Sequence, residues 1–492
     1  MIPFLLAASA GLAFVVAFPP YSIGLASFVG ATLFWLAVRR SATAWRAAAA
    51  GFLAGFVFYG LLMWWIANLG WVAWVPLTLA LAAFPAIAAL VGSAFRSRSD
   101  WVWVITAAAG WGLLELIRVR FPLGGLPWGA LGFTMGDYAV TRSATQWIGT
   151  SGWTVVIVAA GAAAALAIER RRWQLMIPMA AIVAGLALIG WISTPGADGT
   201  ELRVAIVQAE NPCPATHCVG ERQTVYRNHL ELTRESVSPG EVDLVVWAES
   251  SAGFLTDPAI NPEVASEVAA EARRLGSYLI MGSDRPVGED QFVNVNILFS
   301  PDGEVVDEYR KVHPVPFGEY VPARPLFDWI PELDRVPRDM IPGAGPVVFQ
   351  LPQGSFGSVI SFEAAFHRYF RDHVAAGADL MVVATNQSSY GMAPAADQLI
   401  GITRMRAAEL GIDIAHSAVT GRSTFIDAAG ETGYRTGLYR AEVIKETLRF
   451  SQGGDTLYFR LRDWVVLVLI GLAVVFEIRR RVAAREAARV GP

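Results

Sequence analysis

Apolar runs of membrane-spanning length constrain the fold of this chain more than any other feature. Seven lie within the first 195 residues and an eighth lies near the C-terminus, and most approach the roughly 20 residues that cross a hydrocarbon layer about 30 Å thick. They occupy residues 3–18, 22–38, 47–67, 72–95, 101–117, 151–168, 174–193 and 463–478. The 492-residue chain is 54% hydrophobic and only 17% charged, whereas soluble domains carry roughly 25% charged residues. We therefore expect an α-helical transmembrane bundle of eight helices.

Arginine is concentrated in every second connection between these runs. The clusters follow the second, fourth, sixth and last runs and comprise Arg39, Arg40, Arg46, Arg96, Arg98, Arg170, Arg171, Arg172, Arg479, Arg480, Arg481 and Arg485. Positive residues stay on the cytoplasmic side, so both termini are predicted to be cytoplasmic and residues 196–455 extracytoplasmic. The first run lacks a positive segment before it, which favours a retained helix over a cleaved signal peptide.

The third run continues into MWWIANLGW, residues 63–71. Tryptophan side chains are enriched where the hydrocarbon layer meets water. We therefore expect Trp64, Trp65 and Trp71 to lie at the membrane–water interface.

The periodicity of the sequence changes after STPGADGTE (193–201), which has the composition of a linker. Short β-rich runs then alternate with helical patterns at 220–237, 262–275, 364–376 and 394–410, a pattern that predicts an α/β domain with mixed, buried sheets. The predicted domains are a seven-helix region (1–195), an external domain (196–455), and a last helix with a basic tail (456–492). The net charge of −4 argues against a nucleic-acid partner.

Three chemically useful side chains stand at the ends of β-like runs in this domain. Glu249 ends VDLVVWAE, Lys311 follows DEYR, and Ser361 ends GSVIS, just before a helix-like pattern that begins at Glu363. A strand that stops at a helix start exposes a nucleophile to outward-pointing amides. Serines at strand ends are more often turn residues, and Glu and Lys more often form surface ion pairs. The three residue types together nevertheless favour a catalytic site in which they converge on one reacting atom.

In this chain order, Glu249, Lys311 and position 361 resemble the Glu-Lys-Cys triad of the nitrilase superfamily. The apolar runs narrow the resemblance to the bacterial apolipoprotein N-acyltransferases. The resemblance covers nearly the whole chain and implies seven helices, an external nitrilase-like αββα sandwich and one more helix. One departure is chemical, because this chain has Ser361 where the family has cysteine. Two origins are open: replacement of a family enzyme's cysteine, for example to trap substrate, or a natural variant with altered activity.

The resemblance also assigns supporting residues. Glu319 in PFGEYVP and Glu363 in SFE match glutamates that support the family's site, although Glu363 could equally be a first-turn acid of the following helix. Asn386 in VVATNQSSYG, with Tyr390 nearby, and Trp128 in LGGLPWGALGF match family stretches that imply substrate contacts. Ser389 stands where many members have tryptophan.

Two other groups of polar residues have simpler expected roles. Glu115 is expected to pair with Arg118 or to cap the loop that follows it. Cys213 and Cys218 lie on the predicted external side, where a local disulfide is plausible. Two free thiols, or a zinc site that includes His217, are the alternatives. No metal or organic cofactor is expected.

The resemblance implies an integral enzyme of the bacterial cytoplasmic (inner) membrane, expected to be a monomer. Its nucleophile would take an acyl chain from a phospholipid and pass it to the α-amino group of a lipoprotein's N-terminal diacylglyceryl-cysteine, with ping-pong kinetics. With Ser361 in place, the transfer is expected to be very slow or absent. The alternatives are a carbon–nitrogen hydrolase and a non-catalytic membrane scaffold.

Overall fold

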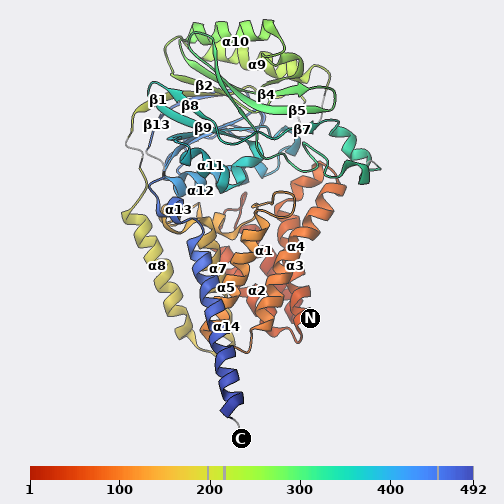
Figure 1. The fold of residues 1–492 in the computed structure, drawn as a ribbon, viewed down its shortest axis with the longest axis vertical. Coiled ribbons are helices and arrows are strands. Elements are labelled where there is room, and N and C mark those ends of the chain that lie inside the picture. Colours follow the sequence, from red (N-terminus) through yellow and green to blue (C-terminus); the bar gives the residue numbers. More distant parts are fainter. Residues whose placement is uncertain (197–198, 214–217, 328, 452–453, 491–492) are drawn as a thin grey trace. The chain divides into compact units, whose positions relative to one another are not determined.

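The computed structural model describes residues 1–196, 199–213, 218–327, 329–451 and 454–490. The chain forms two compact units, which Figure 1 traces from the N- to the C-terminus. The first unit comprises Met1–Trp64, Trp74–Thr194 and Arg460–Pro492, and the second comprises Trp65–Ala73 and Pro195–Phe459. A short piece of the N-terminal region therefore belongs to the second unit.

The first unit is a helical bundle. Its helices are α1 (Ile2–Val16), α2 (Ala26–Arg40), α3 (Ala44–Leu62), α4 (Trp71–Ala94), α5 (Asp100–Arg118), α6 (Ala139–Ser143), α7 (Thr145–Arg170), α8 (Met176–Ile192) and α14 (Trp464–Val490), with short 3₁₀ turns η1 (Trp64–Asn68), η2 (Leu131–Met135) and η3 (Trp173–Leu175). Small residues allow close helix approach: a Cβ on Gly11 of α1 would lie 2.6 Å from the Ala54 carbonyl of α3.

The predicted α-helical membrane region is confirmed, but the count of eight spanning helices is not. A helix lies at each of the eight predicted positions. Within the described residues, five segments are long and apolar enough to cross a membrane, namely Ala44–Leu62, Trp71–Ala94, Asp100–Arg118, Thr145–Arg170 and Trp173–Ile192. Helices α1 and α2 have only 15 residues each.

The second unit contains two mixed β-sheets. The first has the order β13–β1–β2–β4–β5–β6, with β3 beside β4 and β7 beside β5, and the second has the order β12–β11–β10–β9–β8. The strands are β1 (Glu201–Gln208), β2 (Leu244–Trp247), β3 (Ala252–Gly253), β4 (Tyr278–Val287), β5 (Gln291–Phe299), β6 (Val305–Arg310), β7 (Asp339–Met340), β8 (Val348–Leu351), β9 (Gly354–Ile360), β10 (Leu380–Thr385), β11 (Asp413–Ala418), β12 (Thr424–Ile426) and β13 (Glu442–Arg449).

Alternating side chains explain the layers of this unit. On β1, Val204 and Ile206 join a buried cluster with Phe356 and Val382 of the second sheet. The intervening Ala205 and Val207 join a different cluster on the opposite face, as the two-residue period of a strand requires. Helices α9 (Glu221–Ser236) and α10 (Pro262–Leu275) contribute to that second cluster and cover the first sheet in Figure 1.

Helices α11 (His367–Ala375) and α12 (Ala395–Leu410) contact strands of the second sheet. The unit is therefore the αββα sandwich that the resemblance implied, and a short helix, α13 (Leu457–Leu461), follows it. One local prediction is wrong. Glu363 does not begin an α-helix, because Ser361–Ala365 form a 3₁₀ turn and α11 starts only at His367.

Candidate active site

A buried carboxylate follows the end of β2. Glu249 is 4% exposed, and each of its oxygens has a donor. Asn294 Nδ2 donates to Oε1 at 2.9 Å, and the backbone N–H of Asn386 donates to Oε2 at 2.7 Å. The carboxylate is therefore held between β5 of the first sheet and the loop after β10 of the second.

A buried ammonium lies against this carboxylate. Lys311 follows β6 and is 1% exposed, and its backbone N–H donates to the Asn294 carbonyl at 2.9 Å. Its Nζ lies 3.4 Å from Glu249 Oε1 and 2.7 Å from Glu319 Oε1. The backbone N–H of Val315 donates to the other oxygen of Glu319 at 2.8 Å, which fixes that side chain. One cation is thus shared by two carboxylates.

The charges in this cluster give Glu249 and Lys311 different protonation states near neutral pH. Burial raises the pKa of Glu249 to about 7. The nearby Glu319 and Asp284 carboxylates also raise this pKa, whereas the charge of Lys311 lowers it. Burial alone would lower the pKa of Lys311, but the Glu319 and Glu249 carboxylates outweigh burial and raise it. Lys311 therefore stays charged, while Glu249 can gain or lose a proton near neutrality.

Ser361 stands on a strained turn at the end of β9. Its φ of 52° lies in the left-handed region, which non-glycine residues rarely adopt and which is common at functional sites. Ser250, directly after Glu249, has a φ of 54°. Ile360 pairs with Ala384 in the parallel β9–β10 ladder. The Ser361 turn and the loop with Asn386 therefore leave the same edge of the sheet.

Glu363 joins the Ser361 turn to the Lys311 loop. It is fully buried, and Oε2 accepts the Ile360 N–H at 2.8 Å. Oε1 accepts the backbone N–H groups of Val312 at 2.7 Å and His313 at 3.0 Å, and Tyr309 Oη donates to both oxygens. Burial raises the pKa of Glu363, although the hydrogen bonds that it accepts from backbone N–H groups lower this pKa in part. Its partners identify Glu363 as a bridge between two loops, a role different from that of a helix-dipole acid.

The three predicted substrate-contact residues have different surroundings. Asn386 meets Glu249 through its backbone, while its Oδ1 accepts the Ser388 hydroxyl at 2.7 Å. Burial raises the pKa of the half-buried Tyr390 to about 12, and the charge of Glu249 adds to the effect. Trp128 belongs to the first unit, where it is buried and its carbonyl accepts Arg118 Nη1 at 2.7 Å.

Glu115 pairs with Arg118, one of the two roles expected from the sequence. Its Oε1 lies 4.0 Å from Arg118 Nη2 and accepts the Thr154 hydroxyl at 3.2 Å. Arg118 also donates to the carbonyls of Leu126 and Trp128 at 2.7 Å. The pair therefore holds the loop after α5.

Sequence reasoning missed two polar residues on β5. Asn294 and Asn296 alternate with valine and isoleucine in FVNVNILF, so both face the same side of the strand. Asn294 donates to Glu249, and Asn296 Nδ2 donates to the Ser358 hydroxyl at 2.7 Å. Two asparagines on one face of a buried strand were the signal that could have located them.

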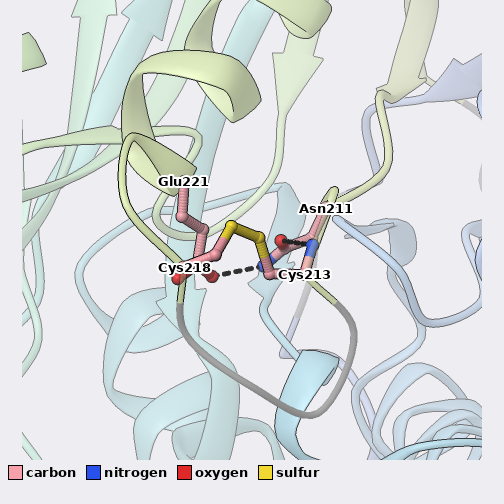
Figure 2. The surroundings of a disulfide bond; sticks show 4 residues. All are labelled: Asn211, Cys213, Cys218 and Glu221. Carbon is pink, nitrogen blue, oxygen red and sulfur yellow. Dashed lines mark hydrogen bonds between the residues drawn. A yellow bond between two sulfur atoms is a disulfide. The ribbon is translucent and has the colours of Figure 1, made fainter.

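The two cysteines form the local disulfide that the sequence left open as one of three possibilities, which excludes free thiols. Figure 2 shows Cys213 and Cys218 beside Asn211, whose Oδ1 accepts the Cys213 N–H at 2.8 Å. Asn211 Nδ2 in turn donates to Glu221 Oε1 at 2.6 Å, which ties the disulfide to the start of α9. His217, the third ligand of the alternative zinc site, lies outside the described residues.

Comparisons with known proteins cover both units. A family model for the apolipoprotein N-acyltransferase N-terminal domain matches residues 10–163, and a carbon–nitrogen hydrolase model matches residues 203–457. An apolipoprotein N-acyltransferase of Geobacter metallireducens is 26% identical over 97% of this chain and 96% of its own length. One of Sinorhizobium medicae is 30% identical over 86% and 85%. Among solved structures, an amidase from Nesterenkonia is 19% identical over 54% of this chain and 97% of its own, with a TM-score of 0.40.

Proposed function

The chain belongs to the apolipoprotein N-acyltransferase family, and we propose that it moves an acyl chain from a membrane phospholipid to the α-amino group of a lipoprotein's N-terminal diacylglyceryl-cysteine. One observation within the fold carries this proposal. A buried ammonium, Lys311, is shared by Glu249 and Glu319 beside a loop that Glu363 ties to the turn of Ser361. Such an arrangement supplies a base, a cation and a nucleophile.

We propose the following roles in the first half-reaction. Glu249 takes the proton of the Ser361 hydroxyl as its oxygen attacks the ester carbonyl of the phospholipid. Lys311 stabilises the oxyanion that forms. The ester bond to the glycerol oxygen breaks, the lysophospholipid leaves with the proton from Glu249, and the acyl chain remains as an ester on Ser361.

In the second half-reaction the lipoprotein amine attacks this ester. Glu249 takes a proton from the amine and returns it to the Ser361 oxygen as the amide forms. Glu319 holds Lys311, Glu363 positions both loops, and Asn386 with Tyr390 lines the site. Trp128 is assigned to lipid contact on its resemblance alone. A serine hydroxyl is harder to deprotonate than a thiol, which slows the first step, and a serine ester reacts with amines more slowly than a thioester does, which slows the second.

The test uses the purified full-length protein, phospholipid vesicles and a synthetic diacylated lipopeptide. Mass spectrometry should detect the lipopeptide with one added acyl chain and an equal amount of lysophospholipid. Release of free fatty acid or ammonia from simple esters or amides, without transfer, would favour a hydrolase. Binding of the lipopeptide by every version of the protein, with no reaction in any, would favour a membrane scaffold.

The proton exchange at Glu249 predicts a pH dependence. With Ser361→Cys in place to give a measurable rate, kcat/KM for transfer should rise about tenfold per pH unit below pH 7 and then level off, because Glu249 must be ionised to act as a base. The apparent pKa belongs to the Glu249–nucleophile pair. Measurements from pH 5 to pH 9 check this, and a constant rate between pH 5 and pH 7 would exclude Glu249 as the base.

We also propose the membrane topology, the domain division 1–195, 196–455 and 456–492, and a monomeric state. The arginine clusters support cytoplasmic termini and an extracytoplasmic second unit. Asp302 lies exposed in the turn between β5 and β6. A membrane-impermeant maleimide should therefore label the Asp302→Cys protein in intact cells.

Arg485→Cys, in the basic tail, provides the matched control and should react only after the cells are permeabilised. The native cysteines are paired and do not compete for the reagent. Labelling of position 302 only from the cytoplasm would reverse the proposed topology.

A further inference from the structure

The connection between two membrane helices contributes to the catalytic unit. Residues Trp65–Ala73, which comprise most of η1 and the first residues of α4, belong to the second unit. Helices α3 and α4 themselves both have membrane-spanning length and composition. Neighbouring tryptophans differ sharply here. Trp64 is 47% exposed, whereas Trp65 is 3% exposed. Trp65 is therefore a buried part of the second unit.

Trp65 contacts two elements near the candidate active site. Its Nε1 donates to Gln398 Oε1 on α12 at 3.2 Å. The centroid of its ring lies 4.5 Å from the centroid of the Tyr390 ring, and the angle between the two ring planes is 58°. Three residues on, Asn68 Nδ2 donates to the carbonyl of Tyr390 at 3.0 Å. The same short turn thus holds Tyr390 by its ring and by its backbone.

These contacts lead to Glu249 through one loop. Residues 386–391 begin at Asn386, whose N–H donates to Glu249 Oε2, and end at Gly391, which has a φ of 64°. Within the loop, the Tyr390 N–H donates to the Gln387 carbonyl at 3.1 Å. One end of the loop therefore holds the carboxylate of the proposed base, and the other end is held by η1.

We propose that Trp65 is a positioning residue for acyl transfer, which fixes the 386–391 loop through Tyr390 and thereby orients the carboxylate of Glu249. This inference rests on the proposed role of Glu249 as the base. A base must lie within hydrogen-bond reach of the proton that it takes, and displacement of a reacting group by about 1 Å can cost roughly 100-fold in rate. The proposed site thus includes Trp65–Ala73, a segment that lies far from the αββα sandwich in the sequence.

The experiment uses the full-length protein with Ser361→Cys in place. Trp65→Ala should lower kcat by about 10- to 100-fold with little change in KM, because the base is misplaced while the lipid substrates still bind. Trp65→Phe keeps an aromatic ring against Tyr390 and should recover most of kcat. The matched control Trp64→Ala removes an exposed tryptophan one residue away and should leave kcat unchanged.

A second readout does not depend on acyl transfer. The thiol introduced at position 361 can be alkylated with iodoacetamide between pH 5 and pH 9. Trp65→Ala should shift the midpoint of the rate profile to higher pH by roughly one unit, because a displaced Glu249 no longer shares the thiol proton. Lys311, Glu319, Asp284 and Tyr390 also face Glu249 and are unchanged in every variant.

Asn68→Ala tests the same contact with less risk of a folding defect, because Asn68 is exposed and its side chain donates to the Tyr390 carbonyl. It should shift the alkylation profile in the same direction by a smaller amount. Coincident alkylation profiles for Trp65→Ala, Trp64→Ala and the parent would overturn the inference. The inference would also be overturned if Trp65→Phe did not recover the kcat lost in Trp65→Ala and the alkylation profile of Asn68→Ala were unchanged. Failure of the parent to transfer acyl chains, with the profiles still shifted, would overturn only the proposed function.

Discussion

Ser361→Cys is expected to raise the rate of acyl transfer by at least about 100-fold. A free thiol has a pKa of about 8.5, so Glu249, with a pKa of about 7, can deprotonate it at modest energetic cost. A serine hydroxyl is far less acidic and needs a stronger base. The thioester that results is also more reactive towards the lipoprotein amine than the serine ester. Both half-reactions should therefore accelerate, as measured by mass spectrometry of the lipopeptide.

Two further variants separate the chemistry from other effects of a new thiol. Adding Glu249→Gln to the Ser361→Cys protein should abolish transfer, because the amide cannot accept the proton. Ser238→Cys places a thiol on the exposed segment after α9 and should leave the original rate unchanged. Equal turnover by the original protein and the Ser361→Cys protein would contradict the nucleophile role of position 361.

Helix boundaries in the second unit were predictable because local chemistry sets them. The predicted helix at 262–275 has the bounds of α10. Asn261 Oδ1 accepts the N–H groups of Glu263 and Val264, Pro262 occupies the first turn, and Gly276 has a φ of 63° after the last turn. Each signal acts within a few residues, so the sequence contains all of them.

One edge strand of the first sheet was harder to predict. Strand β13, with the sequence EVIKETLR, pairs with β1 more than 200 residues earlier and is largely exposed. Its charged residues hide the two-residue period of a buried strand. The third membrane helix was also predicted too long, because apolar MWWIA continues its pattern, whereas the chain turns into η1 after Met63 and joins the second unit.

The residues of the candidate site could be predicted better than their contacts. Glu249, Lys311 and Ser361 stand at strand ends that the sequence reveals. The role of Glu363 depends on donors at Tyr309, Val312 and His313, about 50 residues away. No local pattern encodes such a pairing, so Glu363 could not be distinguished from an ordinary first-turn acid.

Lys311→Met is expected to reduce acyl transfer by the Ser361→Cys protein by roughly 100- to 1,000-fold. The substitution removes the cation that we assign to the oxyanion, a type of interaction worth roughly 100- to 1,000-fold for a single donor. It also leaves two carboxylates, Glu249 and Glu319, together in a buried site. Removal of one partner from a buried charge cluster costs about 3–5 kcal/mol of stability, so the variant should also melt at a lower temperature.

The pH dependence of that loss identifies its cause. Without Lys311, the folded-state pKa of Glu249 should rise further above its present value of about 7, while its unfolded value stays near 4.5. A raised folded-state pKa favours folding at low pH and loses that contribution as pH increases through it. The stability deficit of Lys311→Met should therefore be small at pH 5 and large at pH 8, as measured by thermal melting in detergent. Lys445→Met, which breaks the exposed pair with Glu241, should melt like the parent at both values. An equal deficit for Lys311→Met at pH 5 and pH 8 would mean that lost packing, and not the unbalanced carboxylates, destabilises the protein.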